Sequence, residues 1–386
     1  MRLILASNHL GLGGSESYLL TVAEQLERLG HETTLYTREP GAGADLARSR
    51  GFRVVDESQL PDECDAALVQ DAGVCLDLAS RYPRSGQVFV AHSEVFDLQL
   101  PPQLEGLVSA VVVLSDRVAD RLRALAVPPR VVRLRQPIDT ERFVPGAPLP
   151  ERPRRALLLS NNPVGDRLAM LESACAETGV ELARVGGDAG QAGDPRSQLV
   201  DADVVIGYGR SILEAMACGR AAYVYDRHGC DGWVTADSYA EIEAGGFGGR
   251  TGRTIADREA LAADLARFDP EMGPVNHDIV AAHHRANVHA QELVELLEGA
   301  GREAPVTHGP LEEMARLVRM EWRARVDAQA LAGEQARLQA ERHRLERRAE
   351  QAAVQTAKAF RGTLSWRLTK PLRAVSRLLA RVGIGR

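Results

Sequence analysis

The sequence of 386 residues lacks the signatures of several large protein classes. Its five cysteines are odd in number and none has Cys-x-x-Cys spacing, which argues against a disulfide framework and favours reduced intracellular thiols. No His-Glu-x-x-His motif or Cys/His cluster is present, so we expect neither a metal nor another cofactor. The formal net charge of −6 argues against a general nucleic-acid binder.

Long hydrophobic runs are also missing. No apolar stretch approaches the roughly 18 residues of a membrane-spanning helix. The first residues, MRLILASNHLG, contain too short an apolar run for a signal peptide. We therefore expect a cytoplasmic protein, or one attached peripherally to the inner face of the cell membrane.

Short apolar runs alternate with amphipathic helical patterns over residues 1–136. Strands are predicted at 3–6, 32–37, 65–70, 87–92, 110–115 and 130–134, and helices at 15–30 and 116–125. Strands separated by helices indicate βαβ units, hence a parallel sheet covered by helices on both faces.

The proline-rich stretch QPIDTERFVPGAPLPERPRR interrupts this pattern, and we assign 137–155 as an interdomain linker. The alternation resumes over 156–276, with strands at 156–160, 180–187, 203–207 and 221–226. The repeated rhythm predicts an α/β protein of two doubly wound, Rossmann-like domains that face each other across a cleft. Residues 277–298 are predicted to form one closing helix.

The composition changes after residue 310. Residues 311–360 are rich in Ala, Glu, Arg and Gln, with Leu331, Leu338 and Leu345 seven apart. Only one heptad seam is apolar, which predicts an extended single helix or a weak coiled coil. Residues 361–386 contain no acidic residue and combine basic side chains with an apolar stripe, which is typical of a membrane-surface segment. The alternatives are a helix that docks on the protein, or a disordered basic end. Nucleic acid fits the charge but not the apolar stripe.

Two glycine turns follow predicted strands and open predicted helices. The first, GLGGSES at 11–17, includes Gly13 and Gly14, whose backbone N–H groups could face an anion. The alternative is a plain turn with Ser15 as the helix cap.

The second turn, GYGRSILEAMACG at 207–219, carries one glutamate, Glu214, on an otherwise apolar helix. A carboxylate one turn inside a helix can bind the diol of a ribose while the backbone N–H groups bind a phosphate. The alternatives are that Glu214 pairs with Arg210 four residues earlier, or completes a capping box with Ser211.

Four stretches together resemble a family 4 glycosyltransferase of the GT-B fold: GLGGSE, FVAHS at 89–93, QPIDTERFVP, and DADVVIGYGRSILEAMACGRAAYVYD. The resemblance covers roughly residues 1–300, and the SWRLTKPLR tail is similar to tails of bacterial surface-polysaccharide enzymes. It implies retaining transfer of a sugar from a nucleotide-sugar donor to a glycan or lipid-linked acceptor in polysaccharide synthesis. The alternatives are a catalytically degenerate GT-B scaffold or binding protein, and, less favoured, a nucleotide-sugar epimerase.

The resemblance also implies roles for particular residues. A histidine in the place of His92 contacts the donor sugar, although His92 could simply cap a strand end. Glu214 would bind the ribose, and Arg210 would act as a substitute phosphate clamp. These three are the predicted catalytic residues. The predicted substrate-binding residues are Gly13, Gly14, Glu16, Asn161, Arg167, Tyr208, Gly209 and Ser211.

Three positions depart from the family pattern. Ile206 stands where the first glutamate of the Glu-x7-Glu motif is expected, and Gln136-Pro137 replaces an Asn-Gly pair. The Arg and Lys that hold the donor diphosphate are replaced by SNNPVGDR, in which Arg167 is the only cation. The donor base, the sugar and the acceptor are not specified by these motifs.

Overall fold

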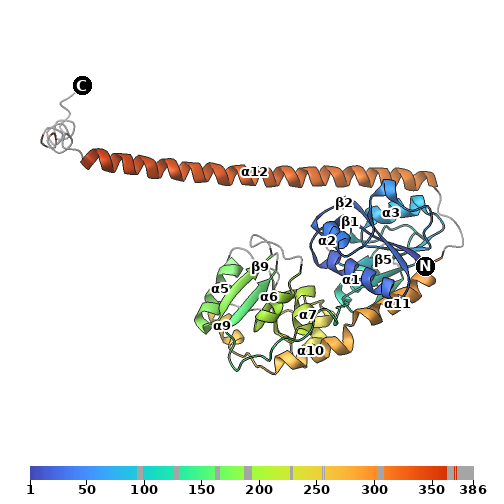
Figure 1. Ribbon diagram of the computed structural model, residues 1–386, viewed down its shortest axis with the longest axis horizontal. Helices are drawn as coiled ribbons and strands as arrows, with labels where there is room; N and C mark the ends of the chain where they lie inside the picture. Colours follow the sequence, from blue (N-terminus) through green and yellow to red (C-terminus); the bar gives the residue numbers. More distant parts are fainter. Residues whose placement is uncertain are drawn as a thin grey trace. The chain divides into compact units, whose positions relative to one another are not determined.

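A computed structural model describes residues 1–93, 99–125, 130–160, 166–186, 194–226, 229–253, 255, 257–301, 308–362, 369 and 371. The chain forms two compact units, Met1–Arg316 and Leu317–Arg386. The first unit contains two α/β domains, seen in Figure 1 as the blue and green halves of the ribbon.

The first domain is built on a seven-stranded parallel sheet in the order β3-β2-β1-β4-β5-β6-β7. Its strands are β1 (Arg2–Leu10), β2 (Glu32–Pro40), β3 (Val54–Val55), β4 (Ala66–Val69), β5 (Gly86–Ala91), β6 (Ala110–Val113) and β7 (Val131–Arg133). Its helices are α1 (Gly14–Arg28), α2 (Ala42–Ser49), α3 (Ala72–Arg81) and α4 (Asp116–Arg123), with a 3-10 turn, η1, at Glu57–Gln59. The predicted parallel sheet is confirmed.

Strand β1 lies inside this sheet, between β2 and β4, and its sequence explains the position. The run from Leu3 to Ala6 is at most 2% exposed, as expected of a parallel strand covered on both faces. The strand is longer than the predicted run of four residues, because its pairing with β2 continues to Leu10, opposite Pro40. The extension carries the chain directly to the first glycine turn.

The second domain has a five-stranded sheet in the order β12-β11-β10-β8-β9. Its strands are β8 (Arg155–Leu159), β9 (Glu181–Val185), β10 (Val204–Gly207), β11 (Ala221–Asp226) and β12 (Gly229–Trp233). The edge strand β12 pairs antiparallel with β11 and was not predicted. The helices are α5 (Asp166–Thr178), α6 (Arg196–Asp201), α7 (Arg210–Ala217), α8 (Tyr239–Ala244), α9 (Arg258–Leu265) and α10 (Met272–His283).

The predicted single closing helix at 277–298 is wrong. The region contains the end of α10 and a second helix, α11 (Ala286–Glu298), which meet at His284–Arg285. Helix α10 packs on α7 and β11, whereas α11 packs on α1, β4 and β5 of the first domain. The break is stabilised by the linker, because Ile138 N donates to His284 O (2.7 Å) and Ala286 N donates to Ile138 O (3.0 Å). The two segments that cross between the domains are therefore hydrogen-bonded to each other.

The second unit is largely the continuation of one long helix, α12 (His308–Gly362), as the extended-helix prediction requires. Leu331, Leu338 and Leu345 are 62%, 57% and 55% exposed on it. Within the part of the chain that the structure describes, no helix is long and apolar enough to cross a membrane. The apolar and basic stripes predicted for the tail lie outside the described residues, and the coiled coil stays a prediction.

Candidate active site

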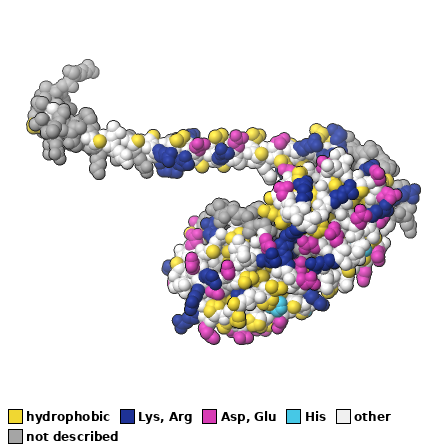
Figure 2. Space-filling model, viewed as in Figure 1, with side chains coloured by type: hydrophobic (Ala, Val, Ile, Leu, Met, Phe, Trp, Pro, Cys, Tyr) yellow, Lys and Arg dark blue, Asp and Glu magenta, His cyan; other side chains and the backbone are white. Residues whose placement is uncertain are grey.

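A cavity of about 240 Å³ lies between the two domains. It is lined by both glycine turns, by α1 and by the start of the linker, and Figure 2 shows basic and acidic side chains gathered at this junction. Seven predicted site residues line it: Gly13, Gly14, Tyr208, Gly209, Arg210, Ser211 and Glu214. Cofactor and substrate sites are typically concave and set between domains, which makes this cavity the candidate active site.

The first glycine turn brings the N-terminus of α1 to the cavity. Gly13 is the residue before the helix, and no side chain among the described residues caps it, so the alternative of a cap by Ser15 is wrong. The Ser15 hydroxyl instead donates to Glu16 Oε2 (2.9 Å). Glu16 folds back over the turn, so that a Cβ on Gly13 would lie 2.5 Å from Glu16 Oε2. A side chain at Gly13 would therefore have to displace the Glu16 carboxylate.

The second glycine turn has a backbone that only glycine adopts readily. Gly209 precedes α7 with a φ of 60°, in the region that disfavours a Cβ. A Cβ on Gly207 would lie 2.7 Å from Leu159 O of the neighbouring strand. The expected cap or capping box by Ser211 is wrong, because its hydroxyl donates to Tyr208 O (2.8 Å) and no side chain among the described residues caps the helix. The turn is set by glycine conformation and tight packing rather than by a side-chain cap.

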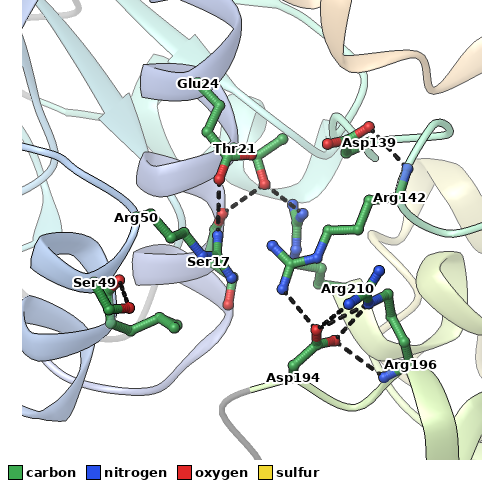
Figure 3. Close-up of polar contacts among 11 residues, drawn as sticks. Ser17, Thr21, Glu24, Ser49, Arg50, Asp139, Arg142, Asp194, Arg196 and Arg210 are labelled. Atoms are coloured by element: carbon green, nitrogen blue, oxygen red, sulfur yellow. Dashed lines mark hydrogen bonds and ion pairs between the residues drawn. The ribbon is translucent and has the colours of Figure 1, made fainter.

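The Arg210 guanidinium connects three parts of the first unit. Nε donates to Glu214 Oε1 (2.8 Å), Nη1 to Pro137 O (2.7 Å) and Nη2 to Thr21 Oγ1 (2.8 Å). These acceptors belong to α7, the linker and α1, and Figure 3 shows the arginine reaching toward Thr21. The Arg210 side chain is 5% exposed. In this arrangement Arg210 acts as a buried connection between the domains.

Glu214 lies beneath the second glycine turn with its side chain 10% exposed. Burial raises the pKa of this carboxyl above its ordinary value, although the charge and hydrogen bond of Arg210 oppose the shift. The pairing with Arg210, one of the two alternatives to ribose binding, is thus present in the structure. Glu214 still lines the cavity, so its predicted role in binding a ribose stays a prediction.

His92 follows β5 and packs edge-on against Tyr18, with ring centroids 4.9 Å apart. Its Nε2 is buried and has no hydrogen-bond partner among the described residues. Burial, with a smaller effect of the Arg210 charge, lowers the pKa of His92 to about 4, which keeps the imidazole neutral at physiological pH. A neutral imidazole here could accept or donate one further hydrogen bond.

Three predicted site residues that the structure describes, His92, Glu16 and Arg167, do not line the cavity. Glu16 covers Gly13, and Asn161 lies outside the described residues. Arg167, on α5, stacks over the Tyr225 ring at 4.6 Å and donates from Nη2 to Gly229 O (3.1 Å). The guanidinium of Arg167 thus packs against the β11–β12 hairpin, away from the residues that line the cavity.

Two histidines bind the residues that lead into the linker, one at the junction of α10 and α11 and one on α11. His289 Nδ1 bonds to Arg135 O (2.9 Å), and its Nε2 bonds to Tyr18 Oη (2.8 Å). Because a carbonyl only accepts, Nδ1 carries the proton and Tyr18 donates to Nε2. His284 repeats the arrangement between Gln136 O (2.8 Å) and Tyr239 Oη (2.9 Å). Together with Arg210 they bind the three consecutive carbonyls of Arg135, Gln136 and Pro137, where the first domain passes into the linker.

Sequence reasoning missed several polar and charged residues of the cleft. Thr21, Glu24, Arg50, Asp139 and Arg142 line the cavity. Asp194 and Arg196 line a second pocket, which shares Glu24, Arg50, Asp139 and Arg142 with the cavity. The sequence could have indicated Arg142, because this residue lies between Asp139 and Phe143 in the linker motif that carries the family resemblance. Among the described residues there is no group of three or more His, Cys, Asp or Glu side chains arranged to hold a metal ion.

Comparison with known proteins identifies the fold. Neither a protein-family model nor a curated protein matches the sequence. Among solved structures, HepE of Anabaena in complex with UDP-glucose superimposes with a TM-score of 0.56 and 14% identity, over 78% of this chain and 100% of that one. An α-glucosyltransferase in complex with UDP and a DNA containing an HMU base superimposes with a TM-score of 0.54 and 12% identity, over 77% and 99%. These similarities show that the chain has the predicted GT-B fold.

Proposed function

We propose that the protein is a retaining glycosyltransferase that moves a sugar from a nucleotide-sugar donor to a glycan or lipid-linked acceptor. The observation that carries the proposal is the cavity between two GT-B domains, lined by the first glycine turn on one side and by Gly209, Arg210 and Glu214 on the other. The solved structures of similar fold were determined with UDP-glucose or with UDP, which supports a nucleotide-sugar as the donor.

The chemistry requires stabilisation of a leaving diphosphate. Transfer breaks the bond between the anomeric carbon and the diphosphate oxygen, so negative charge develops on the leaving group. The N-terminus of α7 offers backbone N–H groups at the cavity, and arginines line it, so the proposal invokes no metal or other cofactor. Glu214 would bind the ribose, while Gly13 and Gly14 would face the acceptor and the donor phosphate.

The first test is nucleotide binding. UDP, GDP and ADP are titrated separately into the full-length protein by calorimetry, and saturable binding of one of them is expected. The second test is a donor screen against glycan and lipid-linked acceptors, with released nucleotide as the readout. If no nucleoside diphosphate or nucleotide sugar binds saturably, the proposal that the protein is an enzyme is wrong.

A second candidate function is a GT-B scaffold that has lost catalysis. Ile206 in place of the motif glutamate and the buried Arg210–Glu214 ion pair at 2.8 Å favour it. Glu214→Gln separates the two, because the amide oxygen still accepts from Arg210 while the charge is lost. An enzyme should lose several-fold or more in turnover with Glu214→Gln and with Glu214→Ala, whereas a scaffold keeps its biological role.

We also propose that the tail attaches the protein reversibly to an anionic membrane, where surface polysaccharides are assembled. Each basic residue near such a surface contributes about 1 kcal/mol. The tail offers seven: Arg361, Arg367, Lys370, Arg373, Arg377, Arg381 and Arg386. The test is co-sedimentation with anionic liposomes of the full-length protein and of a chain ending at Phe360. The full-length protein should bind more strongly, and equal binding of both would contradict the proposal.

A further inference from the structure

The arginines that line the cavity differ in how many of their guanidinium N–H groups already bond to protein acceptors. Among the described residues, the cations that line the cavity are Arg50, Arg142 and Arg210. Arg210 has each of its three nitrogens bonded to a protein acceptor and is 5% exposed. Arg142 is bonded through Nη2 to Asp194 (3.1 Å), and its side chain is 21% exposed. An incoming anion can therefore reach Arg142 more readily than Arg210.

The backbone of Arg142 is held in place from both sides. Asp139 Oδ1 accepts from Glu141 N (3.0 Å) and from Arg142 N (3.2 Å), which closes a tight turn. Phe143, the next residue, is 4% exposed and packs in the core of the second domain. These two anchors leave the Arg142 side chain projecting into the cleft, as Figure 3 shows. A cation on a rigid turn loses little freedom when it binds a ligand.

Asp194 bridges Arg142 to a second guanidinium. Its Oδ2 contacts Arg142 Nη2 (3.1 Å) and Arg196 Nη2 (2.8 Å), and Arg196 Nε donates to both carboxylate oxygens (3.1 and 2.9 Å). Partial burial alone would raise the pKa of Asp194, but the Arg196 amide and the two arginines hold it below its ordinary value. The carboxylate thus remains charged, and it binds the two guanidinium groups as an anionic ligand would.

We propose that Arg142 and Arg196 bind the diphosphate of the nucleotide-sugar donor, and that the Asp194 carboxylate occupies their anion site until the donor displaces it. The inference rests on the proposed function and assigns the diphosphate contacts to the linker and to the start of α6, rather than to Arg167. The charges support the exchange, because two arginines facing one carboxylate retain a positive charge that a doubly charged diphosphate would neutralise. The Asp194 side chain is 33% exposed, so it can leave the pair for solvent.

The experiment compares a nucleoside diphosphate with its nucleoside. The full-length protein is titrated by calorimetry with UDP, GDP and ADP and with uridine, guanosine and adenosine. Arg142→Ala and Arg196→Ala should each weaken the diphosphate that binds by about tenfold or more, as expected for loss of a charge-assisted hydrogen bond. The affinity for the matching nucleoside should change less than about twofold, since it makes no phosphate contact. Arg142→Lys should fall between the wild type and Arg142→Ala.

Two further variants make the test specific. Asp194→Asn removes the competing charge and should tighten the diphosphate several-fold, a gain that misfolding cannot produce. Arg152→Ala is the matched control, because Arg152 is an exposed arginine of the same linker and should leave binding unchanged.

The outcomes separate the two proposals. If the wild type binds no nucleoside diphosphate, the proposed function itself is wrong. If it binds one, and Arg142→Ala and Arg196→Ala bind as the wild type does, the proposed function stands and this inference is overturned. Equal weakening of diphosphate and nucleoside would also overturn it, since the arginines would then support the whole cleft rather than the phosphates.

Discussion

Acid should destabilise this protein through the histidines that hold the linker, and His289 offers the sharpest test. The imidazole is 3% exposed and lies between Arg135 O and Tyr18 Oη. Burial lowers its pKa from 6.5 to about 3, outweighing the hydrogen bond to the Arg135 carbonyl, which favours the charged form. The perturbation is His289→Gln, which cannot bind the proton and keeps one donor and one acceptor.

The magnitude follows from proton linkage. The folded pKa lies below the unfolded one, so the unfolded chain binds the proton first and stability is lost as pH falls from 7 toward the folded pKa. For an unfolded pKa of 6.5 and no protonation of the folded state, lowering the pH from 7 to 5.5 removes about 1.2 kcal/mol of stability. His92 and His284, whose pKa values burial lowers to about 4, should behave in the same way. The variant should therefore lose about a third of this combined pH dependence.

The assay is urea unfolding of the wild type and His289→Gln at both pH values, followed by fluorescence and circular dichroism. The variant should be less stable at pH 7 by about 1–3 kcal/mol, because two buried hydrogen bonds are altered. The gap should shrink by about 1.2 kcal/mol at pH 5.5. His343→Gln, at an exposed position of α12, serves as the control. A gap that is the same at both pH values would refute the reasoning, since it would mean that His289 is protonated equally in both states.

Two further predictions concern the packing of the first unit. Arg210→Leu should cost about 3–5 kcal/mol, because it leaves the Glu214 carboxylate buried without its partner, and adding Glu214→Leu should recover most of the loss. Equal stability of the single and double variants in urea would contradict this coupling. Gly86→Ala should destabilise by about 1–3 kcal/mol or more, because the new Cβ would lie 1.6 Å from Ala300 O. Gly333→Ala, where α12 leaves open space, should instead favour the helix by up to about 1 kcal/mol, and thermal denaturation of both variants checks the contrast.

Much of the fold could be predicted because its signals are local. Runs such as Leu3–Ala6 and Val204–Ile206 are apolar on both faces, and only a strand covered on both sides needs such a run. The repetition of these runs on either side of a proline-rich segment was enough to predict two doubly wound domains. The glycine turns at 11–14 and 207–209 could also be predicted, because in both places glycines stand between a predicted strand and a predicted helix.

Tertiary structure decided which polar groups meet. The break between α10 and α11 depends on Ile138, which is distant in sequence and hydrogen-bonds to both sides of it. Arg210 became a buried connection rather than an open phosphate clamp because Thr21 and the Pro137 carbonyl lie within 2.8 Å of it. The sequence by itself determines where strands, turns and charges lie along the chain. Burial and pairing depend on which distant segments pack together, so only the tertiary structure showed that Arg142 of the linker pairs with Asp194, the carboxylate that also binds Arg196.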